Sequence, residues 1–109
     1  DKKIVWGIMK IFKWTLRIDG WQEIEMPIGT QILSMQIQNE NPQLWALVEE
    51  KNATEKRLFI TCATGQEMPG DVVDYIGSYQ IKNGSLVFHV FEQITAQKKR
   101  NLILNVSKT

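Results

Sequence analysis

Two runs of strand-forming residues flank the dipeptide Asn83-Gly84, and together they cover residues 75–92. Asn-Gly is the strongest short-range signal for a tight β-hairpin, because both residues tolerate the positive φ angles of its turn. The hairpin that it predicts places this chain among β-rich proteins. No catalytic, metal-binding or nucleotide-binding motif accompanies it, so the feature constrains the fold and leaves the function open.

Apolar and polar residues alternate in three segments of the N-terminal half, which is the pattern of a half-buried strand. The segments are residues 12–18, 21–26 and 31–38. Asp19-Gly20 separates the first two and predicts a second tight hairpin. In the third segment, alternation predicts that Leu33, Met35 and Ile37 share the buried face.

Residues 44–48 are apolar on both faces, which is typical of a central strand or of a strand that faces an interface. Residues 57–63 form the next strand-like run, and we expect the two runs to pair as a hairpin across a charged loop. Residues 64–70 contain two glycines and a proline and predict an irregular loop. Residues 71–75 could form one helical turn with Asp71 as its N-cap.

We therefore expect an all-β fold, or a β-rich fold with one short helix. Its architecture would be a small antiparallel sandwich or barrel of about seven strands. The chain of 109 residues suffices for one domain, which we place at residues 9–95. Residues 1–8 would be a leader or extension, and residues 96–109 a basic and then apolar tail.

The charges of the chain exclude some classes of function. It carries 13 basic and 12 acidic side chains, so a net charge of +1 supplies no general field that attracts nucleic acid or an anionic membrane. No apolar run reaches the length of a membrane span. We expect neither a nucleic-acid polymer nor a membrane as partner.

Few side chains suit catalysis or metal binding. Cys62 is the one cysteine and His89 the one histidine, so an intrachain disulfide is excluded, a zinc site lacks its usual ligands and a reducing compartment fits. His89 could be a buried acid–base group, but a structural histidine fits the alternating run around it better. Cys62 fits the role of a small buried side chain. We therefore predict no enzyme, no metal and no cofactor.

Aromatic residues are numerous for a domain of this size, and they suggest a binding surface. Trp45 lies on the strand with two apolar faces, one of which could be covered by a ligand or by a second subunit. Backbone N–H groups in the following glycine-containing loop could receive an anion. The predicted ligand-binding residues are Trp45, Thr64, Gly65, Gln66, Tyr79 and His89.

Several segments together resemble a family of small bacteriophage and prophage proteins of unknown function. The matching residues are Met26-Pro27, Gly29, Ile32-Leu33, Gln36, Gln38, Leu44–Val48, Tyr75–Gly77, Gln80 and Leu86–Glu92. The likeness runs from Met9 to about Ile94. Gln66 departs from the family pattern, which often has a histidine there. The resemblance implies a phage origin and a host-cytoplasm setting, and it supplies no activity.

Two functional hypotheses follow, from different classes. The first is a non-enzymatic, self-associating binding protein of phage origin. It would counteract host defence by sequestering a small nucleotide-type ligand or by blocking a host protein. The alternative is a structural or virion-accessory protein that assembles by pairing of edge strands, with residues 4–8 and 102–106 as the candidate edges. A homo-oligomer is expected under both hypotheses.

Overall fold

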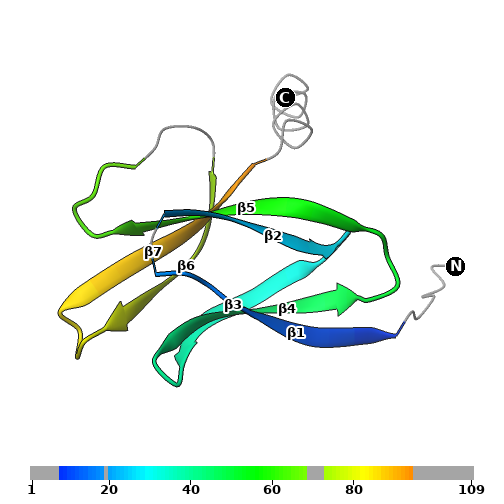
Figure 1. Ribbon diagram of the computed structural model, residues 1–109, viewed down its shortest axis with the longest axis horizontal. Helices are drawn as coiled ribbons and strands as arrows, with labels where there is room; N and C mark the ends of the chain where they lie inside the picture. Colours follow the sequence, from blue (N-terminus) through cyan, green and yellow to red (C-terminus); the bar gives the residue numbers. More distant parts are fainter. Residues whose placement is uncertain (1–7, 19, 69–72, 95–109) are drawn as a thin grey trace, which may run out of the picture.

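The computed structural model of the protein describes residues 8–18, 20–68 and 73–94. Its seven strands form two antiparallel sheets, one of three strands in the order β1-β4-β3 and one of four in the order β2-β5-β7-β6 (Figure 1). The predicted all-β class is therefore confirmed. The strands are β1 (Met9–Thr15), β2 (Gly20–Pro27), β3 (Gln31–Gln38), β4 (Asn41–Glu49), β5 (Thr54–Ala63), β6 (Val73–Ile81) and β7 (Leu86–Gln93).

No helix occurs in the described ranges, so none there is long and apolar enough to cross a membrane. The predicted helical turn is wrong over residues 73–75, which belong to β6, and its first two residues lie outside the described chain. The predicted C-terminal tail and all of the predicted leader except Ile8 also lie outside it.

Two of the predicted hairpins are wrong, because consecutive strands lie in different sheets. β1 pairs with β4 and β2 pairs with β5, so the chain passes from one sheet to the other between Thr15 and Gly20. β4 and β5 are likewise separated: β1 and β3 occupy both edges of β4, whereas β2 and β7 occupy both edges of β5. The hairpin around Asn83-Gly84 is confirmed, with Lys82–Ser85 as its turn between Ile81 and Leu86.

The core lies between the sheets and takes side chains from both. Leu44 at the centre of β4 is fully buried, and so are Ala46 and Val48, two and four positions further along the same face. The main cluster of buried side chains consists of Leu16, Ile24, Met26, Met35, Leu44, Phe59, Tyr79 and Val90.

Both strands that meet across the core, β3 and β6, contain a β-bulge. In β3 the bulge follows Ile32, so that Ile32 packs on the core and Leu33 stays exposed. The alternation had placed Leu33 on the buried face, and this prediction is wrong because one extra residue reverses the side on which a side chain lies. In β6 the bulge lies between Tyr75 and Gly77.

Gly77 in β6 lies against Met35 in β3, where the two sheets pack on each other. A Cβ atom at this position would lie 3.3 Å from the Cβ of Met35 in β3, which is tighter than nine in ten real Cβ contacts. Glycine therefore permits the close packing of β6 on β3. This packing aligns the β6–β7 turn with the β3–β4 turn at the same end of the molecule (Figure 1).

An ion pair stabilises the edge of the core. Nε and Nη2 of Arg57 in β5 donate to the two carboxylate oxygens of Glu92 in β7, at 2.6 and 2.8 Å, and Nη1 donates to the carbonyl of Thr30 at 2.6 Å. The two side chains are only 15% and 14% exposed. Hydrogen bonding to Glu92 raises the pKa of the Arg57 guanidinium, so this group stays charged at every ordinary pH.

Candidate functional site

The outer face of the four-stranded sheet carries two neighbouring rows of side chains that run across the strands. The strand pairing places Trp21, Ile60, Phe91 and Tyr75 in one row. The next row contains Cys62, His89 and Ser78. The first row is aromatic at its ends and the second is polar at its centre and edge, so ring faces and hydrogen-bonding groups lie side by side.

The aromatic row is exposed to solvent at its two ends and buried at its centre. Tyr75 is 61% exposed and Trp21 45%, whereas Ile60 between them is almost fully buried. The ring of Tyr75 meets the ring of Phe91 edge to face, with centroids 5.6 Å apart. This contact fixes the plane of an exposed tyrosine at the edge of the sheet.

Four polar side chains form a continuous line of hydrogen bonds beside this ring. The Oη atom of Tyr75 lies 2.6 Å from Oγ of Ser78, which lies 2.8 Å from Nδ1 of His89. The Nε2 atom of His89 lies 2.7 Å from Oγ1 of Thr64. The line therefore connects β6, β7 and the loop after β5.

The bulge in β6 makes this line possible. Tyr75 and Ser78 are three positions apart, and regular alternation would place them on opposite faces of the strand. The extra residue, Ile76, packs on the core instead, and Tyr75 and Ser78 both face outward. Ser78 and His89 are direct cross-strand partners, at equal distances along the chain from Asn83-Gly84.

The partners of each group indicate the direction of the hydrogen bonds. Oγ1 of Thr64 donates to the carbonyl of Val87 at 3.4 Å, so it accepts from Nε2–H of His89. In the tautomer that matches this direction, Nδ1 of His89 accepts from the Ser78 hydroxyl, which in turn accepts from Tyr75. The outer lone pair of Tyr75 Oη remains as an acceptor for an N–H group of a ligand.

Both ring nitrogens of His89 are engaged by hydroxyl groups. The imidazole is thus not oriented by a carboxylate, as it is in a Ser–His–Asp triad. Nowhere in residues 8–18, 20–68 and 73–94 do three His, Cys, Asp or Glu side chains gather as metal ligands. The arrangement suits recognition of a ligand by hydrogen bonds.

The loop after β5 is held by its own hydrogen bonds. The N–H of Gln66 donates to the carbonyl of Ala63 at 3.0 Å, and the side-chain oxygen of Gln66 accepts from the N–H of Ala63 at 2.9 Å. Gly65 supplies the positive φ of 89° that this turn requires. Because the N–H groups of Thr64 and Gln66 are used within the protein, the predicted anion site keeps few free donors.

The structure brings some of the predicted ligand-binding residues together and separates others. Thr64 and His89 are in contact, and Gly65 and Gln66 continue the same loop. Tyr79 is buried in the core, stacked on Phe88.

Trp45 belongs to the other sheet. It is half-buried on the outer face of β4, with Nζ of Lys13 5.4 Å from the centre of its ring. Tyr75 and Ser78 were missed as site residues. Counting outward from Asn83-Gly84 would have paired Ser78 with His89, whereas nothing in the sequence indicated the bulge that brings Tyr75 beside them.

Comparison with known proteins gives a family. Residues 9–101 match the model of a family described as Domain of unknown function (DUF7352). No curated protein and no solved structure matches the chain.

Proposed function

The chain belongs to the DUF7352 family, and we propose that it is a non-enzymatic binding protein that recognises a small nucleotide-type ligand on the outer face of its four-stranded sheet. The observation that carries this proposal is the line of hydrogen bonds from Tyr75 through Ser78 and His89 to Thr64. It places an exposed aromatic ring beside hydroxyl and imidazole groups whose orientations are fixed.

The chemistry of this site matches a nucleobase. A base can stack on the exposed ring of Tyr75, and such stacking contributes about 1–3 kcal/mol. Its exocyclic or ring N–H groups can donate to the free lone pair of Tyr75 Oη. The four-stranded sheets of RNA-recognition domains stack bases on exposed aromatic side chains in this way, so a flat sheet surface can hold a base.

Titration calorimetry of the wild type and of two Tyr75 variants tests the proposal. The ligands are cyclic dinucleotides, ADP-ribose derivatives and adenosine, with inorganic pyrophosphate as the phosphate-only control. Tyr75→Ala should weaken binding about ten-fold or more through loss of stacking, and Tyr75→Phe should weaken it less because the ring remains. Leu33→Ala, an exposed position on the other sheet, should bind as the wild type does.

Two outcomes would contradict the proposal. One is the absence of heat from every nucleotide and nucleoside. The other is equal affinity of Tyr75→Ala and the wild type, because a ligand bound elsewhere would not depend on this ring.

The phage setting is part of the proposal and is supported by the resemblance of Leu44–Val48 and Leu86–Glu92 to phage proteins. In that setting the protein would act in the host cytoplasm, and withholding a signalling nucleotide would counteract host defence. Blocking a host protein through the same aromatic face is the variant of this proposal that requires no small ligand.

A second candidate, assembly through strand pairing, is favoured by the edge strand β1. Its outer edge is unpaired in the described chain, and Ile8, Met9 and Ile11 are exposed beside or on it. An apolar edge of this kind is a template for pairing with another copy. Both a ligand-binding protein and an assembly protein could self-associate through this edge of β1.

A further inference from the structure

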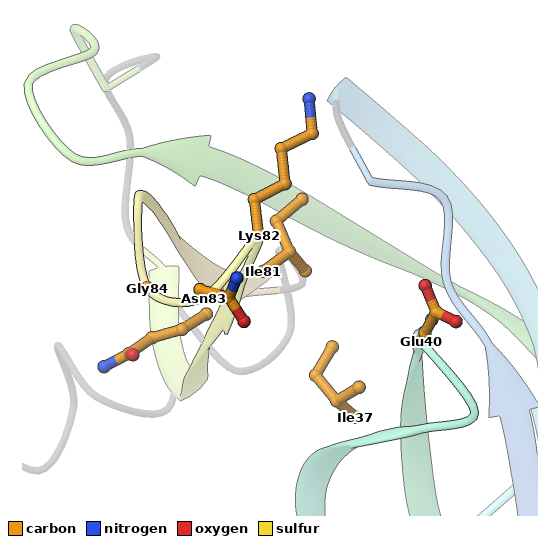
Figure 2. A pocket seen from close by; sticks show the side chains of 7 residues that line it. Ile37, Glu40, Ile81, Lys82, Asn83 and Gly84 are labelled. Carbon is orange, nitrogen blue, oxygen red and sulfur yellow. The ribbon is translucent and has the colours of Figure 1, made fainter.

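A cleft of about 750 Å³ opens between the β3–β4 turn and the β6–β7 turn (Figure 2). Its size lies within the range of sites that hold drug-sized ligands. It shares no residue with the face described above, so an inference about it goes beyond the proposed function. The residues that line it are Ile37, Glu40, Gln80, Ile81, Lys82, Asn83 and Gly84.

The two turns contribute opposite charges to the cleft. Glu40 comes from the β3–β4 turn and Lys82 from the β6–β7 turn (Figure 2). Among the described residues, neither side chain has a hydrogen-bond or ion-pair partner. Ile37 and Ile81 provide apolar surface in the same cleft.

The backbone of both turns is held in an unfavourable conformation. Asn39, Glu40, Lys82 and Asn83 are the non-glycine residues with positive φ in the described chain, and all four belong to these two turns. Glu40, with φ of 68°, holds the position of a two-residue turn where glycine is preferred. Strain that persists at charged residues around a cavity is characteristic of sites under functional constraint.

From these observations we propose that the cleft binds a short zwitterionic peptide with an aliphatic side chain. Glu40 would accept from the peptide ammonium, and Lys82 would donate to its carboxylate. The aliphatic side chain would pack on Ile37 and Ile81, and the amides of Gln80 and Asn83 would bond to the peptide backbone. A volume of about 750 Å³ leaves room for more than one amino acid.

The experiment titrates the 109-residue chain with the tripeptide Ala-Leu-Ala in three forms: with free ends, with an acetylated N-terminus and with an amidated C-terminus. Affinity is measured by calorimetry, and the site is located by amide chemical shifts in NMR spectra. Each blocked form should bind about three-fold or more weakly than the free form, as expected for a solvent-exposed ion pair. The shifts should concentrate at Glu40, Lys82 and Asn83.

Charge variants assign each end of the peptide. In Glu40→Gln, acetylation should no longer change the affinity, and in Lys82→Gln, amidation should no longer change it. Glu25→Gln and Lys56→Gln, which alter a cross-strand pair away from the cleft, should retain both effects. The proposal is overturned if the free tripeptide does not bind, if the blocked forms bind equally well, or if the shifts lie on other residues.

Discussion

Glu40, like Lys82, holds a left-handed backbone conformation that its long side chain does not favour. A left-handed conformation costs a non-glycine residue about 1–2 kcal/mol, because the Cβ atom approaches the following carbonyl oxygen. The neighbouring Asn39 tolerates the same region better, since its short polar side chain can bond locally. The strain at this turn therefore belongs to one residue, which also supplies the carboxylate of the cleft.

Replacing Glu40 with glycine should raise the free energy of unfolding by about 0.5–1 kcal/mol, because the strain is relieved while the unfolded chain gains freedom. Urea unfolding would measure the change. Glu25→Gly, in the extended strand β2, is the matched control and should lower stability instead. An unchanged urea midpoint for Glu40→Gly would show that the turn stores no strain. The stabilised variant should also lose its preference for a peptide with a free N-terminus.

At the scale of elements, β1 exposes two large apolar side chains, Met9 and Ile11. It lies at the edge of the three-stranded sheet, and Ile11 on its outer face is 62% exposed. Proteins usually protect such an edge with charge, and the lysines at positions 10 and 13 are directed to other partners, Glu50 and Gln38. The edge is thus available to a second copy of the chain.

We predict that the wild type sediments and scatters light as an assembly larger than a monomer and that Ile11→Lys is a monomer. The introduced charge would be buried by strand pairing, which makes the assembly unfavourable. Ile28→Lys, at an exposed position in the turn after β2, should leave the assembly intact. A monomeric wild type would contradict the prediction.

The existence of the strands was predictable from the sequence, whereas their partners were not. Alternation is a local property, and it located the strands from the Gln31–Gln38 segment to the Asn83-Gly84 hairpin. Pairing depends on which edges remain free after distant segments have folded. The predicted hairpin at Asp19-Gly20 is wrong for this reason, because β1 pairs with β4 and β2 pairs with β5.

The candidate site was predictable in the same partial way. The Asn83-Gly84 turn sets the register that brings His89 opposite Ser78, so this contact follows from local sequence. Thr64 reaches His89 only because β5 pairs with β7, and Tyr75 reaches Ser78 only because of the bulge in β6. Both events depend on packing between distant strands, which alternation does not encode.

On the scale of the whole molecule, both sheets depend on one core. Leu44 is fully buried at the centre of the three-stranded sheet and belongs to the same cluster as Phe59 and Val90 of the other sheet. Removing side chains from this cluster should therefore weaken both sheets together. A domain of this size is expected to unfold in one cooperative step.

Leu44→Ala should lower the free energy of unfolding by about 3 kcal/mol through lost burial and a residual cavity. Tryptophan fluorescence reports on both sheets, because Trp21 lies in one and Trp45 in the other. If the sheets unfold together, fluorescence and circular dichroism should therefore give the same urea midpoint. The exposed Leu33→Ala should cost less than about 0.5 kcal/mol. Two separate transitions would show that the sheets are independently stable.

The passage of successive strands between the sheets also affects how the protein folds during synthesis. When the ribosome has produced the chain as far as β4, the first sheet has all three of its strands, but β2 still lacks β5, its eventual neighbour. β2 therefore stays unpaired on the nascent chain until β5 has been translated. Translation pauses between Glu49 and Thr54 would lengthen that wait, and exposure to proteases and chaperones would be greatest there.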